Sequence, residues 1–210
     1  MKTILCYGDS NTYGYNPYEG SGSRYPKEKR WTTLLSEMLG PDYDVINAGL
    51  NGRTTAYDRG ALYWKNGLKG LAVTMGMFKP IDILIFMLGT NDCNTELNIP
   101  AADIADGMER LIEQAKKNAK IQQGRIPEMM IIVPGAILPD FSNSPFEDKL
   151  SEDSVRKSHE IAELYEKVAE RHDCKFLDAS ELIEVSELDS EHLTEKGHRQ
   201  LAELIYEKLR

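Results

Sequence analysis

The stretch that decides the fold is Met1-Lys2-Thr3-Ile4-Leu5-Cys6-Tyr7-Gly8-Asp9-Ser10-Asn11-Thr12. Its apolar run from Ile4 to Tyr7 is typical of a strand that is buried on both faces, as in a parallel sheet. In open parallel sheets the reactive groups collect at the carboxyl ends of the strands, so the Ser10 hydroxyl is a candidate nucleophile. Gly, Asp and Ser also favour turns, so this tripeptide alone does not separate a turn from a catalytic site.

Similar apolar runs followed by polar turns recur along the chain. We expect further strands at 43–48, 81–88, 129–133 and 175–177, and helices at 31–39, 61–78, 103–119, 154–171 and 194–209. Three glycines make the second of these helices less regular, and Thr194 is placed to cap the last one. The breaker-rich stretches 11–29 and 136–149 are expected to be loops.

This alternation of strands and helices predicts an α/β fold, a parallel sheet with helices on both faces. Right-handed crossovers would bring the carboxyl ends of the first four strands to one edge. The sequence contains no linker or repeat, so we expect a single domain over residues 1–210.

The composition and net charge of the chain argue against several classes of protein. With 41% hydrophobic and 28% charged residues, the chain is typical of a globular protein. No apolar run reaches the roughly 18 residues of a membrane span, and the first seven residues are too short for a signal-peptide core. The net charge of −9 argues against nucleic acid as a partner. Three cysteines without a CxxC pair argue against disulfides or a thiolate metal site. We therefore expect a cytoplasmic protein with no metal or cofactor.

Four polar turns are predicted to converge at the sheet edge: Gly8-Asp9-Ser10, Asn47-Ala48-Gly49, Gly89-Thr90-Asn91-Asp92 and Asp189-Ser190-Glu191-His192. Together they contain the parts of an acyl-transfer site. A serine hydroxyl needs a base, for which His192 is the best-placed residue, and Asp189 can orient the imidazole. The candidate oxyanion donors are the backbone N–H groups of Ser10 and Gly49 and the side-chain amide of Asn91.

With these blocks in this order, the sequence resembles the SGNH (GDSL-type) hydrolases, which are serine esterases and lipases. Ser10, Gly49, Asn91 and His192 match the four residues that give the family its name, and Asp189 matches its acid. The resemblance implies a three-layer α/β/α flavodoxin-like fold with a central five-stranded parallel sheet. Residues 11–15, 51–55 and 192–198 look like the arylesterase and acyltransferase branch, which implies a homo-oligomer.

The function implied is hydrolysis of short-chain acyl esters, acetyl or aryl, through a Ser-His-Asp triad and an acyl-enzyme, with acyl transfer as a further activity. We place Asn11, Tyr13, Tyr15 and Leu193 at the substrate pocket, although tyrosines in such a loop could also cover the core or an oligomer contact. The alternatives are a carbohydrate O-deacetylase and a non-catalytic flavodoxin-like binding module. Gly52 is the alternative to Gly49 as oxyanion donor, and the family pattern favours Gly49.

Other polar residues receive structural interpretations. Asp9 and Asp92 are expected to fix turns, and Arg53 to form a salt bridge or to meet an anionic substrate group. The acidic run 181–191 is expected to be solvated apart from Asp189, and Cys93 is placed where it could touch substrate. The remaining histidines are expected at helix surfaces or caps, since no pair has the spacing of a metal site: His159, His172 and His198.

Overall fold

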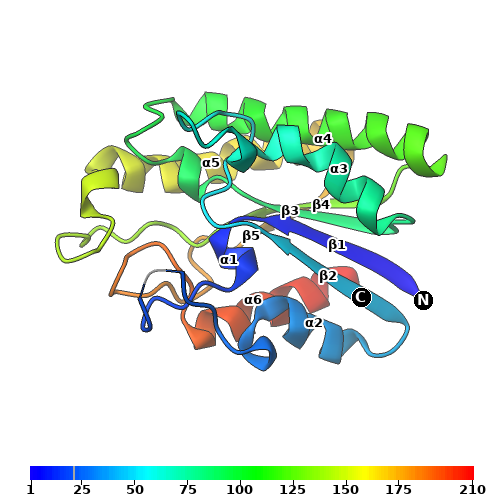
Figure 1. Ribbon diagram of the computed structural model, residues 1–210, viewed down its shortest axis with the longest axis horizontal. Coiled ribbons are helices and arrows are strands. Elements are labelled where there is room, and N and C mark those ends of the chain that lie inside the picture. Colours follow the sequence, from blue (N-terminus) through cyan, green and yellow to red (C-terminus); the bar gives the residue numbers. More distant parts are fainter. Residues whose placement is uncertain (21) are drawn as a thin grey trace.

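The computed structural model describes residues 1–20 and 22–210, so position 21 of the predicted loop 11–29 lies outside the described residues. Five parallel strands form one sheet in the order β2-β1-β3-β4-β5 (Figure 1). Their bounds are β1 (Lys2–Gly8), β2 (Tyr43–Gly49), β3 (Ile83–Met87), β4 (Glu128–Val133) and β5 (Lys175–Asp178). The predicted five-stranded parallel sheet is confirmed.

Helices cover both faces of this sheet, which gives the predicted three layers (Figure 1). On one face lie α3 (Gly67–Phe78), α4 (Ala101–Gln123) and α5 (Glu152–His172), and on the other lie α2 (Trp31–Leu39) and α6 (Glu195–Leu209). Each face has its own hydrophobic core. Along β1, Leu5 and Tyr7 belong to the first core, whereas Ile4 and Cys6 belong to the second. Burial of alternate residues on opposite faces explains the uninterrupted apolar run.

The strand order determines where a site can form. The chain passes from β1 to β2 at one edge and then returns across β1 to β3. The direction of sheet growth therefore reverses between β1 and β3, and ligands of open α/β sheets bind outside the carboxyl ends of the strands at such a switch point. The turns that carry Ser10 and Asn91 follow these two strands.

Several segments differ from the sequence-based expectation. The predicted loop 11–29 includes the one-turn helix α1 (Ser10–Tyr13) and a 3₁₀ turn, Lys27–Lys29. Helix α1 exists because the Asp9 side chain accepts from the Asn11 N–H at 2.9 Å and Gly14 ends the turn at φ 91°. The predicted helix 61–78 divides into the 3₁₀ turn Tyr63–Lys65 and α3, which Asn66 caps. Two further 3₁₀ turns are Thr90–Asp92, within the predicted polar turn after β3, and Glu147–Lys149, within the predicted loop 136–149.

Candidate active site

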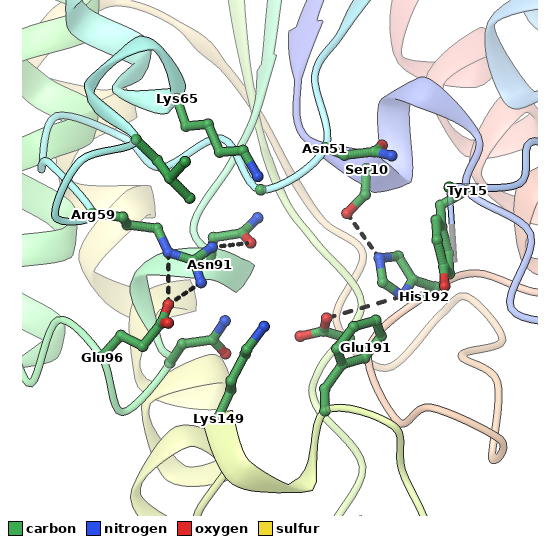
Figure 2. A pocket seen from close by; sticks show the side chains of 15 residues that line it. Ser10, Tyr15, Asn51, Arg59, Lys65, Asn91, Glu96, Lys149, Glu191 and His192 are labelled. Carbon is green, nitrogen blue, oxygen red and sulfur yellow. Dashed lines mark hydrogen bonds and ion pairs between the residues drawn. The ribbon is translucent and has the colours of Figure 1, made fainter. Parts of the chain in front are cut away.

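A chain of hydrogen bonds links three residues that come from opposite ends of the sequence. Ser10 Oγ lies 2.8 Å from His192 Nε2, and His192 Nδ1 lies 2.7 Å from Asp189 Oδ2 (Figure 2 shows the Ser10–His192 contact). All three residues are buried. With the Nδ1 proton held by Asp189, Nε2 is free to accept the Ser10 proton, as a general base must.

The loop before α6 folds so that Asp189 faces the imidazole. The turn passes through Ser190 at φ 67°, a left-handed conformation that brings Asp189 and His192 together. Asp189 Oδ1 accepts from the His192 backbone N–H at 3.1 Å, and Ser144 Oγ donates to the Asp189 carbonyl at 2.8 Å. The Ser186 N–H donates to the His192 carbonyl at 2.7 Å. The acid and the base therefore form one hydrogen-bonded unit.

Asn11 joins this loop to α1. Its side-chain amide donates to the Glu191 carbonyl at 3.0 Å, and its side-chain oxygen accepts from the Leu193 N–H at 2.9 Å. Asn11 is only 2% exposed. Since Ser10 is the neighbouring residue, this pair of bonds fixes the serine relative to the histidine.

Two aromatic rings pack against the imidazole of His192. The Tyr15 ring lies over it with centroids 4.2 Å apart, and the Phe146 ring meets it edge-on at 5.7 Å. These contacts restrict rotation of the imidazole. Phe146 comes from the loop after β4, so three separate segments hold the base in place.

The charges around His192 favour its protonated form. Burial alone would lower the pKa of His192, but the hydrogen bond to Asp189 and the charges of Glu191, Asp189 and Asp9 together raise that pKa above its ordinary value. Burial raises the pKa of Glu191 to about 7, and a Glu191 carboxylate oxygen lies 4.0 Å from His192 Nδ1. Its other oxygen is buried and has no hydrogen-bond partner among the described residues.

Ser10 and His192 open onto a cavity of about 320 Å³ (Figure 2). Most of the described lining residues have polar or charged side chains. The lining residues are Ser10, Tyr15, Gly22, Asn51, Gly52, Arg59, Leu62, Lys65, Asn91, Asn94, Glu96, Phe146, Lys149, Glu191 and His192.

The predicted oxyanion donors differ in how they are placed. The Gly49 N–H donates to Asn47 Oδ1 at 3.1 Å, and a Cβ at Gly49 would lie 2.1 Å from the Tyr13 nitrogen. Gly49 is thus occupied in packing β2 against α1, and it does not line the cavity. Gly52 does line the cavity. Within the described chain, neither Gly52 nor Ser10 has an acceptor for its backbone N–H. The geometry therefore favours Gly52, the alternative that the sequence offered, over Gly49 as the candidate for the second backbone donor.

Asn91 lines the cavity, but its amide is partly committed to protein groups. Its nitrogen donates to the Arg53 carbonyl at 3.1 Å and, over a longer 3.4 Å, to Asp9. Its oxygen accepts from Arg59 at 3.1 Å. The N–H that faces Asp9 therefore has the weaker of the two contacts.

Of the four predicted pocket residues, Tyr15 lines the cavity and the other three do not, as far as the described residues show. Asn11 lies behind the site, where it joins α1 to the last loop. Leu193 is 1% exposed and belongs to the core under α6. The Tyr13 ring packs under the Arg24 guanidinium, 4.1 Å away.

Several structural interpretations of single residues also need correction. Glu191 is buried beside His192, whereas the acidic run was expected to be solvated. Cys93 is fully buried in the core and does not reach the cavity. His198 is fully buried rather than on the helix surface, but its Nδ1 accepts from the Trp31 N–H at the start of α2 at 3.4 Å, in keeping with the capping alternative. Burial lowers the pKa of His198 to about 3. Arg53 donates to the carbonyl oxygens of Gly8 and Ala48 instead of forming a salt bridge.

Asp9 and Asp92 fix backbone turns, as predicted. Asp9 caps α1, and both oxygens of Asp92 accept from the Thr55 N–H at 3.0 Å. Burial raises the pKa of Asp9 to about 6 and that of Asp92 to about 7. Asp92 thereby ties the loop after β2 to the end of β3.

Sequence reasoning missed the wall of the cavity that faces the serine. This wall includes Arg59, Lys65, Glu96 and Lys149. None of them belongs to a motif, and they come from loops that meet only when the sheet has formed. Asn94, another lining residue, was nearer to being found, because it lies two residues after the Gly89-Thr90-Asn91-Asp92 turn.

Comparison with known proteins identifies a matching family and similar solved structures. The model of the GDSL-like lipase/acylhydrolase family matches residues 6–200. A solved aryl esterase from M. smegmatis is 32% identical, with 100% of this chain and 99% of that chain covered and a TM-score of 0.92. Est24, a carbohydrate acetylesterase from Sinorhizobium meliloti, is 30% identical, with 100% and 98% covered and a TM-score of 0.90.

A curated relative matches over a shorter region. It is named uncharacterized lipoprotein YqeF of Bacillus subtilis (strain 168), and it is 31% identical over 114 residues. The match covers 54% of this chain and 38% of the length of that relative. Among the described residues of the present chain, no helix is both long enough and apolar enough to cross a bilayer.

Proposed function

The chain belongs to the GDSL-like lipase/acylhydrolase family of carboxylic ester hydrolases, and from that membership we propose that it is a serine esterase for short acyl esters. The observation that carries the proposal is the hydrogen-bonded series Ser10–His192–Asp189 at the edge of a polar cavity. Leu62 and Phe146 are the wholly apolar side chains of the described lining, which suits acetyl and other short acyl groups, because a long alkyl chain would need a larger apolar wall.

The proposed reaction has two halves. Ser10 Oγ attacks the ester carbonyl carbon while His192 Nε2 takes its proton, and Asp189 stabilises the imidazolium. Collapse of the tetrahedral intermediate breaks the bond to the alcohol, which leaves with the proton from His192. Water then attacks the acyl-enzyme with the same base and releases the acid. An alcohol that takes the place of this water would receive the acyl group, which is the acyltransferase activity.

The negative charge on the tetrahedral oxygen needs preorganised donors. We assign this role to the backbone N–H groups of Ser10 and Gly52, which have no acceptor within the described part of the chain. Asn91 supplies the side-chain donor through the N–H that makes only the 3.4 Å contact with Asp9. Loss of one such donor typically costs about 3 to 4 kcal/mol of transition-state stabilisation.

A carbohydrate O-deacetylase is the second candidate, and two side chains favour it. Asn51 and Asn94 line the cavity, and each has a buried amide oxygen with no partner among the described residues. A buried acceptor left unpaired is costly, and the hydroxyl groups of a sugar could satisfy it. Est24, which is named a carbohydrate acetylesterase, has the same fold over the whole chain. A panel of acetylated sugars and aryl acetates separates the two candidates by their relative kcat/KM.

The decisive variant is Ser10→Ala. We expect the rate of p-nitrophenyl acetate hydrolysis to fall by at least about 10³-fold. The variant loses the nucleophile and keeps only substrate binding and the stabilisation of the oxyanion. Labelling by a fluorophosphonate probe should disappear at the same time. Ser142→Ala is the matched control, since Ser142 is exposed and lies outside the cavity lining.

Two results would refute the proposal. If Ser10→Ala hydrolysed the ester at the wild-type rate, Ser10 would not be the nucleophile. If the wild-type protein neither hydrolysed any ester nor reacted with the probe, a non-catalytic flavodoxin-like binding module would be the better description.

A further inference from the structure

The cavity concentrates positive charge in an acidic protein. The whole chain has a net charge of −9. The described lining nevertheless contains three permanent cations, Arg59, Lys65 and Lys149, against two carboxylates, Glu96 and Glu191. Figure 2 shows Lys65 and Arg59 across the cavity from Ser10 and His192, and Lys149 at the lower end of the view.

These cations differ in whether they are already paired. The Arg59 side chain is 9% exposed, forms an ion pair with Glu96 and donates to Asn91. Lys65 and Lys149 have no carboxylate partner among the ion pairs of the described residues. The Lys149 ammonium only approaches the Phe146 ring, at 5.7 Å. Two half-buried ammonium groups therefore face the cavity without a direct ion pair among the described residues, and they share with Arg59 the single negative charge of Glu96, whose pKa all three cations lower.

Lys65 lies next to the proposed reaction centre. A Cβ atom on Gly52 would be 2.7 Å from Lys65 Nζ, so this ammonium packs directly against the glycine assigned to the oxyanion. Burial, followed by repulsion from Arg59 and Lys149, lowers the pKa of Lys65. An anion bound beside Lys65 would relieve that repulsion.

Glu191 is the remaining lining carboxylate. It borders His192, and burial raises its pKa to about 7, so near neutral pH it carries only part of a negative charge. The described lining therefore has an excess of positive charge, and two of its three cations form no direct ion pair. Such a lining attracts ligands of opposite charge.

We propose that the ester hydrolysed at this site carries a negatively charged group, a carboxylate, sulfate or phosphate, which the ammonium groups of Lys65 and Lys149 bind. The charge can belong to the alcohol half or to the acyl half of the ester. This inference rests on the proposed esterase function and adds the substrate class to it.

Matched pairs of esters test the inference in the wild-type protein. For charge in the alcohol half, 4-acetoxybenzoate is compared with 4-acetoxybenzamide, and for charge in the acyl half, p-nitrophenyl hemisuccinate is compared with p-nitrophenyl butanoate. In at least one pair we expect kcat/KM of the anionic ester to be about tenfold higher or more at low salt. The ratio should fall as NaCl is raised from about 20 mM to about 500 mM, because salt screens the attraction.

Variants then locate the effect. In Lys65→Met/Lys149→Met the ratio for the preferred pair should fall to near one, whereas in Lys117→Met, an exposed position on α4, it should keep its wild-type value. Each ratio is measured within one protein, so a general change in activity cancels. Circular dichroism and the Tm of the double variant establish that it is folded, and the salt dependence of the wild type provides the second test.

The outcomes separate this inference from the proposed function. Equal kcat/KM within both pairs, with hydrolysis that still depends on Ser10, would overturn the inference and leave the esterase standing. If no ester were hydrolysed, binding of 4-hydroxybenzoate and 4-hydroxybenzamide to the Ser10→Ala protein by calorimetry would still decide the matter. Tighter binding of the benzoate, lost in the double lysine variant, supports the anion site, and equal binding rejects it.

Discussion

At the scale of single residues, Glu191 is the side chain that most alters the proposed chemistry. Its carboxylate lies 4.0 Å from His192 Nδ1, in addition to the Asp189 carboxylate at 2.7 Å. Two acids therefore stabilise the imidazolium, whereas only one belongs to the triad. Burial raises the pKa of Glu191 to about 7, the charge of His192 opposes that rise, and the charge of Glu191 in turn raises the pKa of His192. The protonation of each group therefore depends on the charge of the other.

We expect Glu191→Gln to shift the acid limb of the kcat/KM profile to lower pH. The reaction needs neutral His192, so activity falls as the pH falls through the pKa of His192. Removal of the Glu191 charge destabilises the protonated imidazole and lowers that pKa, so the variant stays active at lower pH. Profiles with p-nitrophenyl acetate measure the shift, and Glu187→Gln, an exposed position in the same loop, is the control. Superimposable profiles for wild type and Glu191→Gln would refute this role.

At the scale of secondary-structure elements, α1 is too short to hold its own position. A four-residue helix has few internal hydrogen bonds, so its placement depends on its contacts. Asp9 caps its start, the Trp31 indole donates to the Asn11 carbonyl at 3.1 Å, and the Asn11 side chain joins it to the last loop. The distance between nucleophile and base is therefore set by bonds between elements.

We expect Asn11→Leu to lower both stability and activity. The substitution leaves the Glu191 carbonyl and the Leu193 N–H buried without partners, at a cost of about 1 to 3 kcal/mol each. The Tm should fall, and kcat should fall at temperatures where the variant is fully folded, because α1 and the His192 loop can separate. Asn143→Leu, at an exposed loop position, is the control. A normal kcat in a destabilised Asn11→Leu protein would mean that the asparagine stabilises the fold without positioning Ser10.

At the scale of the whole molecule, the buried carboxyls at the strand ends link folding to pH. Asp9 and Asp92 are fully buried, and Asp9 contributes to raising the pKa of Asp92. Their pKa values, about 6 and about 7 in the folded protein, exceed the roughly 3.9 of an unfolded chain. The folded state therefore binds more protons than the unfolded state between these values. The resulting stabilisation is present below about pH 4 and is lost as the pH rises to about 7.

We expect the wild type to lose stability relative to Asp92→Asn between about pH 5 and about pH 8. Asparagine keeps an acceptor for the Thr55 N–H but never acquires the buried charge. Urea unfolding of both proteins at the two pH values gives the difference in free energy of unfolding. Asp42→Asn, at an exposed position, should show no such trend. A wild-type to Asp92→Asn difference that is the same at both pH values would contradict the expectation.

Several whole-molecule expectations from the sequence stay predictions. These are a single domain over residues 1–210, a homo-oligomer, no nucleic-acid partner and a cytoplasmic location. Exposed apolar side chains on α3, Val73 and Met77, are available to an oligomer contact. The curated relative that is named a lipoprotein matches over 54% of this chain. Cell fractionation would test the predicted cytoplasmic location directly.

The sequence by itself determined the sheet and the parts of the site that lie at strand ends. Apolar runs, capping residues such as Thr194 and glycine-rich turns act over a few neighbouring residues, so they can be recognised without knowing the fold. Helix α2 spans the predicted residues 31–39, and Thr194 accepts from the Gly197 N–H at 3.0 Å, as expected of a cap. The order of the four polar turns was enough to nominate Ser10, Asp189 and His192.

The tertiary structure alone decided which groups face the cavity. It put Gly52 rather than Gly49 at the cavity, placed Asn11 behind the site and buried the Glu191 carboxylate 4.0 Å from His192 Nδ1. It also assembled the Lys65 and Lys149 wall from separate loops. The physical reason is that a side chain's exposure and partners depend on packing between segments that can be 182 residues apart, as Ser10 and His192 are. Such contacts form only when the strands have paired and the loops have closed over their ends. A local sequence pattern therefore does not predict them.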